Sequence, residues 1–214
     1  MKKSGSSKQW LRRHVNDPYV QRSKKEGYRA RSAYKLIEID DRDGILRPGQ
    51  FVVDLGAAPG GWSQVAAKRI GASGRVVGID LLPVEPIPGV QFIQGDFAGA
   101  RGLAELRRQM GAGPVDVVLS DMAPNMSGIQ VSDQARVMDL AEISRDFAVA
   151  HLHPEGVFLV KVFQGAGYDE YLKSLRNVFR KVVSRKPGAS RSESAEQFLL
   201  ARGLKPAPVA SGEK

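Results

Sequence analysis

The sequence predicts an α/β protein in which a mostly parallel sheet of seven strands, with an antiparallel pair at one edge, is covered by helices on both faces. Two observations predict this architecture. Apolar, β-branched runs alternate with segments of helical periodicity between residues 51 and 178, as in parallel strands joined by right-handed crossovers. The last two predicted strands are separated by only about ten residues, which is too short for a crossover helix, so they are expected to pair antiparallel.

The predicted elements follow one another in a regular order. An amphipathic helix is expected over residues 32–39, where Ala33, Leu36 and Ile37 share a face. After a turn at residues 47–49, strands are predicted at 51–55, 75–80, 90–94, 115–120, 156–162, 179–185 and 197–202, and helices at 61–70, 99–110, 133–151 and 168–178. We therefore expect a basic, partly disordered extension over residues 1–31, a single domain over residues 32–205 and a flexible tail over residues 206–214.

Positive charge is concentrated at the two ends of the chain. Residues 1–31 contain ten Lys and Arg against two acidic residues, and residues 173–205 contain nine against two, whereas residues 32–172 contain twelve against eighteen. Nucleic acid is the first candidate partner for such basic ends. Trp10, Tyr19 and Tyr28 lie among the Lys and Arg residues of the first segment, as in surfaces that stack on nucleobases. The alternatives are a merely solubilising tail and a membrane surface, and the second is disfavoured because no strong apolar face accompanies the charge.

Composition excludes several kinds of chemistry. The chain has no cysteine, which removes disulfides, thiolate nucleophiles and cysteine-based zinc sites. His14, His151 and His153 form no cluster with acidic residues at ligand spacing, so no metal is expected. No run approaches about 18 apolar residues, and the amino terminus is polar and basic, so we expect neither a membrane span nor a secretory signal. The expected protein is cytoplasmic and monomeric.

The stretch from Asp54 to Trp62 predicts a ligand site. An apolar strand turns there into a helix through a glycine-rich corner, and open α/β sheets bind ligands at such corners. A dinucleotide site would carry G-x-G-x-x-G, but Ala58 and Pro59 stand where its second glycine would approach a pyrophosphate. The corner therefore favours a phosphate-free adenosyl ligand, S-adenosylmethionine (SAM). The residues of the stretch that we expect to bind it are Asp54, Gly56, Gly60, Gly61 and Trp62.

Carboxylates at the ends of successive strands support this cofactor. Asp54, Asp80, Asp96 and Asp121 each close or follow one of the first four predicted strands. A single aspartate at a strand end is often a helix cap or a turn former, but four on one edge are harder to explain in that way. Asp80 is placed for the ribose hydroxyls and Asp96 for the adenine edge, while Asp121 lies nearest the methyl group.

The fourth and fifth strands indicate the chemistry. Ser120–Asn125 lacks the aromatic side chain with which amino-group methyltransferases clamp a base, and cytosine-C5 chemistry needs a cysteine. Lys161 lies inside the apolar strand Phe158–Phe163, where a lysine is costly to bury unless it is paired. Lys161 is either a lysine that extends from the strand end toward water, or a base that removes a proton from a hydroxyl acceptor, or a cation held by carboxylates while a second lysine stabilises the nascent alkoxide.

Six motifs resemble one known family. They are Arg31–Leu36, Val53–Gln64, Asp80–Pro83, Gln94–Phe97, Ser120–Gly128 and Val160–Gly165, which occur in order over nearly the whole chain. On these residues the chain resembles the FtsJ-type (RrmJ-like) 2′-O-ribose methyltransferases, whose bacterial members methylate large-subunit ribosomal RNA. The resemblance implies a Rossmann-like SAM-dependent methyltransferase fold and, as substrate, a uridine in the A loop of 23S ribosomal RNA.

The resemblance also implies a Lys-Asp-Lys-Glu catalytic tetrad, which falls on Lys35, Asp121, Lys161 and Glu196. Lys161 is the expected general base in an in-line methyl transfer, and the other three orient and balance it. Glu193 competes with Glu196 for the last position, but only Glu196 has the Ser-x-Glu-x-aromatic setting of the family. The loop before it departs from the family pattern, because Glu193 and Ala195 stand where arginines are expected.

Two other classes of function remain as alternatives. A nicotinamide-dependent oxidoreductase would use a related sheet, but Ala58, Pro59 and the buried Lys161 argue against it. A non-catalytic RNA-binding factor for ribosome assembly would keep only a vestigial pocket, and the intact tetrad argues against that. The residues alone do not distinguish ribosomal RNA from transfer RNA or other RNA, because each presents the same hydroxyl.

Overall fold

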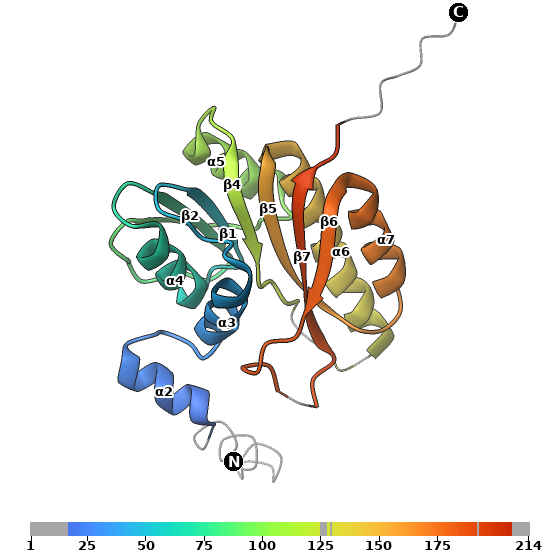
Figure 1. Ribbon diagram of the computed structural model, residues 1–214, viewed down its shortest axis with the longest axis horizontal. Helices are drawn as coiled ribbons and strands as arrows, with labels where there is room; N and C mark the ends of the chain where they lie inside the picture. Colours follow the sequence, from blue (N-terminus) through green and yellow to red (C-terminus); the bar gives the residue numbers. More distant parts are fainter. Residues whose placement is uncertain (1–16, 125–127, 129, 192, 207–214) are drawn as a thin grey trace, which may run out of the picture.

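The computed structural model describes residues 17–124, 128, 130–191 and 193–206. They form one seven-stranded sheet with the strand order β3-β2-β1-β4-β5-β7-β6 (Figure 1). The first five strands in this order are parallel, whereas β7 runs antiparallel to both β5 and β6. The predicted α/β fold class and the antiparallel edge pair are therefore confirmed. The strands are β1 Phe51–Leu55, β2 Arg75–Asp80, β3 Val90–Gln94, β4 Val115–Ser120, β5 Leu152–Phe163, β6 Phe179–Arg185 and β7 Glu196–Leu204.

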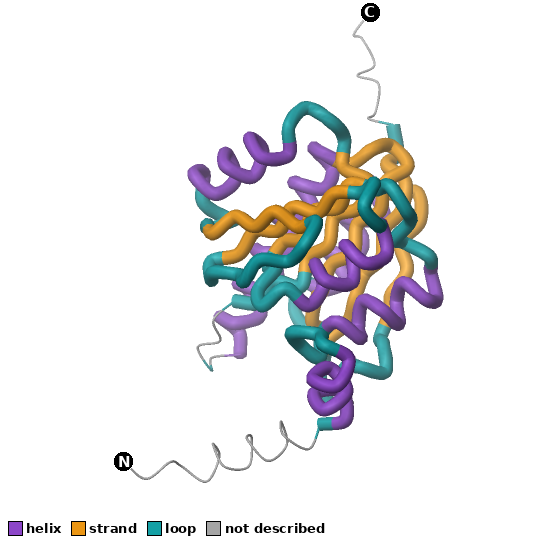
Figure 2. Tube along the Cα trace, turned by 90° about the vertical axis from the view of Figure 1, so that its left-hand side faces the viewer, coloured by secondary structure: helices purple, strands orange, loops and turns teal. Residues whose placement is uncertain are grey.

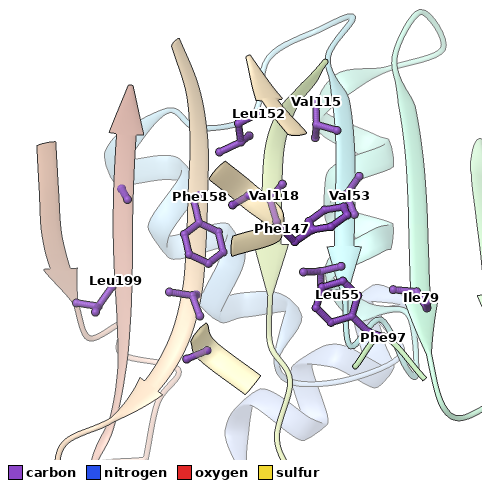
Figure 3. Packing of buried hydrophobic residues seen from close by; sticks show 14 of the residues in the cluster. Val53, Leu55, Ile79, Phe97, Val115, Val118, Phe147, Leu152, Phe158 and Leu199 are labelled. Atoms are coloured by element: carbon purple, nitrogen blue, oxygen red, sulfur yellow. The ribbon is translucent and has the colours of Figure 1, made fainter. Parts of the chain in front are cut away.

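Helices cover both faces of the sheet (Figures 1 and 2). Neighbouring strand residues such as Val52 and Val53 are both buried, because side chains alternate between two covered faces. One face packs against α3 and α4, and the other packs against α5, α6 and α7 around Phe147 and Phe158 (Figure 3). In the described ranges no helix is both long and apolar enough to cross a membrane. The helices are α2 Pro18–Glu26, α3 Ala33–Asp43, α4 Gly61–Ile70, α5 Ala100–Met110, α6 Gln130–His151 and α7 Tyr168–Val178.

The helix α2 was not predicted, because Pro18 suggests a break in a helix. In the structure Pro18 is the first residue of α2, a position where proline loses no hydrogen bond. The side chain of Asp17 caps the helix by accepting from the backbone N–H of Tyr19 at 3.0 Å, and Gly27 ends it in a left-handed conformation. The largest other differences are that α3 continues to Asp43, β5 already begins at Leu152 and α6 begins at Gln130.

Tyrosines attach α2 to the rest of the domain. The ring of Tyr34 on α3 lies 5.5 Å from that of Tyr19 and 5.6 Å from that of Tyr28, measured between centroids. Tyr34 also donates a hydrogen bond to Glu26 at 2.9 Å. Tyr19 and Tyr28, which we expected to offer stacking surfaces to nucleobases, are half-buried against Tyr34, and their stacking on RNA stays a prediction. Residues 1–9, Trp10 and residues 207–214, to which disorder or RNA contact was assigned, lie outside the described residues.

Candidate active site

The predicted corner between β1 and α4 lies at the carboxyl end of the sheet. The backbone N–H groups of Gly56 and Ala57 both donate to the carbonyl of Ile79, which ties the corner to the end of β2. Gly56 has a φ of +79°, and a Cβ atom there would lie 2.6 Å from Cγ of Met122. Only glycine fits this position, because it needs both a left-handed backbone and an empty space beside Met122.

A cavity of about 780 Å³ opens beside this corner. Four of the predicted cofactor residues line it, namely Gly56, Asp80, Asp96 and Asp121. Asp80 accepts hydrogen bonds from the backbone N–H groups of Ala58 at 2.9 Å and Leu82 at 2.8 Å, so its carboxylate is fixed in orientation at the rim. Asp96 is held in the same way by the N–H of Ala98 at 2.9 Å. The strand-end carboxylates thus meet at one cavity, as the parallel topology requires.

The other four predicted cofactor residues do not line the cavity. Asp54 is completely buried beneath the corner. A Cβ atom at Gly60 would meet Ile87 and Arg29, and one at Gly61 would meet Ser32 and Ala30 of the segment before α3. The indole of Trp62 is buried, lies 5.7 Å from the ring of Phe198 and donates a hydrogen bond to the carbonyl of Ser32 at 2.9 Å.

Trp62 and Gly61 thus pack against the segment at the start of α3. The predicted role of Trp62, Gly60 and Gly61 in cofactor binding stays a prediction, and the side chain of Trp62 lies outside the cavity lining. Its position is nevertheless relevant to the site, because α3 carries Lys35.

Asp54 has an unusual environment. Burial raises the pKa of Asp54 to about 7. The hydrogen bond from Ser63 lowers this pKa, and the charges of Asp121 and Asp80 raise it further. Its Oδ2 accepts from the hydroxyl of Ser63 at 2.6 Å, whereas the buried Oδ1 has no hydrogen-bond partner among the described residues. An unpaired acceptor beneath the cavity floor is a group that a cationic ligand above it would stabilise in the ionised form.

The residues of the cavity fit an adenosyl ligand. Phe97, Met122, Leu140 and Ile143 give it apolar walls, while four carboxylates, those of Asp80, Asp96, Asp121 and Asp139, supply acceptors for hydroxyl and amino groups. The same carboxylates would repel phosphates. SAM carries a positive sulfonium at its methyl group, an ammonium and a carboxylate at its amino-acid end, and no phosphate, so it is compatible with this donor set.

Lys161 and Asp121 meet where the cavity ends. Lys161 lies on β5 directly opposite Phe198 of β7, and it is 9% exposed. Its Nζ donates to the backbone carbonyl of Asp121 at 2.7 Å and lies 2.9 Å from Oδ1 of the same residue, an ion pair without hydrogen-bond geometry. Lys161 is thus paired rather than extended to water. The interpretation as a lysine that merely reaches the surface from a strand end does not describe it.

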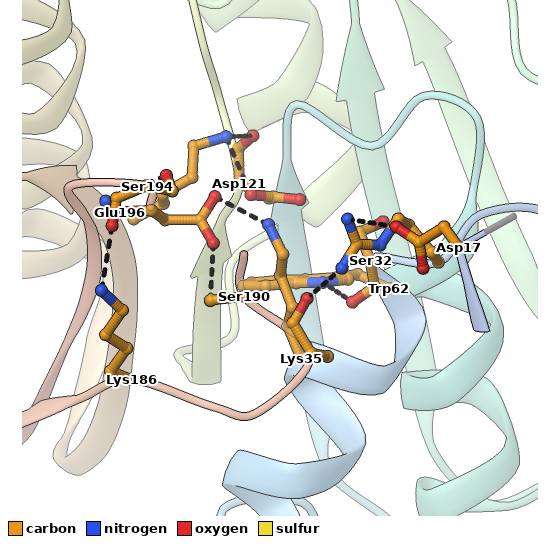
Figure 4. Close-up of polar contacts among 12 residues, drawn as sticks. Asp17, Ser32, Lys35, Trp62, Asp121, Lys186, Ser190, Ser194 and Glu196 are labelled. Atoms are coloured by element: carbon orange, nitrogen blue, oxygen red, sulfur yellow. Dashed lines mark hydrogen bonds and ion pairs between the residues drawn. The ribbon is translucent and has the colours of Figure 1, made fainter. Parts of the chain in front are cut away.

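Glu196 holds the second lysine. Its Oε2 lies 2.7 Å from Nζ of Lys35, and its Oε1 accepts from the hydroxyl of Ser190 at 2.8 Å (Figure 4). Burial alone would raise the pKa of Glu196, but the charge and hydrogen bond of Lys35, the hydrogen bond of Ser190 and the charge of Lys161 together lower this pKa. Glu193 is exposed, so it is Glu196 that occupies the position facing Lys35.

Sheet order explains why residues so far apart in sequence converge. Asp121 follows β4, Lys161 lies on β5 and Glu196 begins β7, and these three strands are neighbours in the sheet. Lys35 reaches the same point from α3, which packs across that face. The result is two lysine–carboxylate ion pairs, Lys35 with Glu196 and Lys161 with Asp121, beside a ligand cavity.

Sequence patterns did not reveal several residues of this region. Arg136, Asp139, Leu140 and Ile143 line the cavity from α6, where no motif distinguishes them from the other residues of a long helix. Ser190 lies in a loop, and its contact with Glu196 depends on the conformation of that loop, which no spacing of residues in the sequence predicts. The described residues contain no group of His, Asp and Glu arranged to hold a metal ion.

An open, mostly parallel sheet with an acidic adenosyl cavity and a Lys-Asp-Lys-Glu cluster is the architecture of an α/β methyltransferase. Comparison with known proteins gives the same class, since residues 28–204 match the model of the FtsJ-like methyltransferase family. The chain therefore belongs to the FtsJ-like methyltransferases.

Its relatives are similar over their full length. Proteins named ribosomal RNA large subunit methyltransferase E from Dechloromonas aromatica and Azoarcus sp. are each 56% identical over 205 residues, which is 96% of this chain and 100% of theirs. A crystal structure named as a ribosomal RNA methyltransferase from Plasmodium falciparum has a TM-score of 0.72 at 28% identity and covers 83% of this chain and 98% of its own.

Proposed function

We propose that this protein transfers a methyl group from SAM to a ribose 2′-hydroxyl of 23S ribosomal RNA in the large ribosomal subunit, at a uridine of the A loop. The names of the full-length relatives support large-subunit ribosomal RNA as the substrate. The contact that carries the proposal is the one between Lys161 and Asp121, because Asp121 also lines the cavity. A donor bound in that cavity would lie next to a lysine able to exchange a proton.

Cofactor binding would use the cavity rim. Asp80 would accept hydrogen bonds from the ribose hydroxyls and Asp96 from the adenine amino group, while Asp121 would lie near the positive charge of the sulfonium. When bound, SAM supplies an activated methyl group, which the 2′-oxygen accepts by displacement in line with the departing sulfur.

Lys161 is the proposed general base. Lys161 would first release the proton of its ammonium group to water. As the new oxygen–carbon bond forms and the carbon–sulfur bond breaks, the proton of the 2′-hydroxyl passes to Lys161, and the ammonium restored in this way is stabilised by Asp121. Glu196 balances the charge of Lys35, so that Lys35 stays beside the reacting oxygen as a fixed cation. The two lysines would thus have different roles: Lys161 becomes a cation by accepting the proton, whereas Lys35 is a cation throughout and stabilises negative charge.

The basic ends are proposed to bind the RNA backbone. Residues 1–31 and 173–205 carry 19 of the 32 Lys and Arg residues, and the second segment contains Glu196 of the tetrad. We propose that residues 32–205 act as a single methyltransferase domain, that residues 206–214 are a flexible tail and that the protein works as a cytoplasmic monomer.

One comparison tests the proposal. Methyl incorporation from labelled SAM would be measured with naked 23S RNA, assembled large subunits and transfer RNA, and the product would be mapped by its resistance to alkaline cleavage. We expect incorporation at one 2′-hydroxyl of large-subunit RNA. Methylation of transfer RNA alone would show that transfer RNA, not ribosomal RNA, is the substrate. Binding to subunits without any incorporation would identify a non-catalytic assembly factor.

A further inference from the structure

The side chain of Arg31 forms its contacts within the protein, although the sequence places Arg31 among the basic residues of the proposed RNA-binding extension. Its Nη1 lies 2.8 Å from Oδ2 of Asp17, and its Nη2 donates a hydrogen bond to the backbone carbonyl of Ala189. Its side chain is 17% exposed. The guanidinium therefore joins the N-cap of α2 to the loop between β6 and β7, across 158 residues of sequence.

Glu38 holds the other side of the same peptide unit. Its Oε2 accepts a hydrogen bond from the N–H of Ala189 at 3.2 Å, and its Oε1 accepts from the hydroxyl of Tyr19 at 3.0 Å. Ala189 is completely buried. Both backbone polar groups of Ala189 are thus bonded to charged side chains from the amino-terminal part of the chain, which fixes the orientation of the loop.

The residue after Ala189 belongs to the tetrad's surroundings. Ser190 donates its hydroxyl to Oε1 of Glu196 at 2.8 Å, and Oε2 of Glu196 pairs with Lys35 at 2.7 Å (Figure 4). The backbone N–H of Ser190 also donates to the carbonyl of Pro187 at 2.9 Å, which closes a tight turn. A displacement of Ala189 would therefore move the hydroxyl that orients Glu196.

We propose that Arg31, together with Glu38, is a positioning residue of the active site, which fixes Ala189 and Ser190 so that Glu196 stays aligned with Lys35. In this role Arg31 acts through the loop and not through a contact with an RNA phosphate. The inference rests on the proposed function, since its measurable consequence is the rate of methyl transfer.

Kinetics of Arg31→Met and Arg31→Lys in the full-length protein test this role. We expect kcat at saturating RNA to fall about 10- to 100-fold in both variants, with the KM values for RNA and SAM within about threefold of wild type. Lysine keeps the charge, but a single ammonium on a shorter stem does not span Asp17 and the carbonyl of Ala189, so it should not rescue the rate. The salt dependence of RNA binding should stay unchanged.

A phosphate contact would give the opposite result. In that case the kcat of Arg31→Lys would be close to that of wild type, and the KM for RNA would rise in Arg31→Met. The slope of log affinity for RNA against log salt concentration would decrease in size by about one in Arg31→Met. Any of these outcomes, or a wild-type kcat in Arg31→Met, overturns the proposal. If the wild-type protein methylates no RNA, the proposed function fails instead, which keeps the two failures distinct.

Two further variants separate positioning from general damage. Glu38→Gln keeps one oxygen acceptor but places an amide N–H group against the hydroxyl of Tyr19 or the N–H of Ala189, which are both donors. Its kcat should therefore fall, with the thermal midpoint nearly unchanged. A wild-type kcat in this variant overturns the proposal even if Arg31→Met does not fold. Arg145→Met is the matched control, because Arg145 is a 21% exposed arginine that pairs with Asp146 and donates to the hydroxyl of Ser174 on α7, and Arg145 itself belongs to neither the cavity lining, the tetrad nor the two basic ends. Its kcat should equal that of wild type.

Discussion

Asp54 shows how one buried group couples the site to pH. It is fully buried, and its pKa is raised from 3.8 to about 7 mainly by burial. A group whose pKa is raised on folding makes its full contribution to stability when the pH lies below the pKa that the group has in the unfolded chain. That contribution is lost as the pH rises through the folded value, because the native state must then bury a charge.

We therefore predict that Asp54→Asn becomes more stable relative to wild type as the pH rises from 4 to 7. The difference in unfolding free energy should change by up to about 1.4 kcal/mol per pH unit over this range and level off above it. Urea denaturation at several pH values measures this difference. A difference that is independent of pH would show that Asp54 has the same pKa in the folded and unfolded protein.

Gly56 illustrates a second constraint at the scale of one residue. Gly56 and Gly27 have similar positive φ values, +79° and +75°, but a Cβ atom at Gly27 meets nothing within 4 Å. Gly27→Ala should therefore cost about 1 kcal/mol of stability for its backbone alone.

Gly56→Ala should cost clearly more, about 2–4 kcal/mol, since its Cβ would clash with Met122 in the wall of the cavity. The affinity for SAM should fall with it, whereas Gly27→Ala should bind SAM like wild type. Thermal unfolding and calorimetric titration give the two comparisons. Equal effects of the two variants would show that the contact with Met122 is unimportant.

At the scale of elements, the segment between α2 and α3 holds the loop after β2. Arg29 donates hydrogen bonds to the carbonyls of Glu85 at 2.6 Å, Pro86 at 2.8 Å and Pro59 at 3.2 Å. One guanidinium thus joins the corner after β1 to the loop that continues from Leu81 and Leu82 at the cavity rim. Because this loop borders the cavity, its order should affect binding of the cofactor.

Arg29→Met should weaken SAM binding about tenfold or more, which corresponds to the loss of roughly one to two charge-assisted hydrogen bonds. The kcat at saturating SAM should change much less, because the tetrad is held by other residues. Equilibrium dialysis with labelled SAM measures the first quantity and steady-state kinetics the second. Unchanged SAM affinity together with weaker RNA binding would assign Arg29 to the RNA instead.

The sequence predicted the central strands well because they are buried on two faces. In β1 every residue except Asp54 is apolar, so the boundaries of this strand are visible without knowledge of the fold. The carboxylates Asp80, Asp96 and Asp121 could be placed together for a related reason, since parallel strands end at one edge of a sheet. Local pattern and topology were sufficient for this half of the site.

Contacts between distant segments could not be predicted in this way. Nothing in the local sequence shows that Trp62 faces Phe198 rather than the ligand, or that Arg31 binds a loop 158 residues later. A proline before a basic segment was interpreted as a break, although Asp17 and Gly27 provide the two caps of a helix. These features depend on which surfaces meet, and that is a property of the whole fold.

At the scale of the whole molecule, the net charge of +9 governs encounter with RNA. If the basic ends bind the phosphate backbone, the affinity for RNA should fall about 10³-fold or more between 50 and 200 mM salt for six or more phosphate contacts. Filter binding of subunit RNA at increasing salt measures the slope. A slope near zero would contradict a role for the basic ends in binding RNA.

The central claim is that Lys161 accepts the proton of the attacking hydroxyl, and Lys161→Ala tests it most directly. The cavity does not use the side chain of Lys161 as a wall, so the dissociation constant for SAM should stay within about threefold of wild type. Methyl transfer to large-subunit RNA in a single turnover should fall by about 10²- to 10⁴-fold, as for loss of a general base. Retained SAM binding with transfer close to the wild-type rate would contradict the claim.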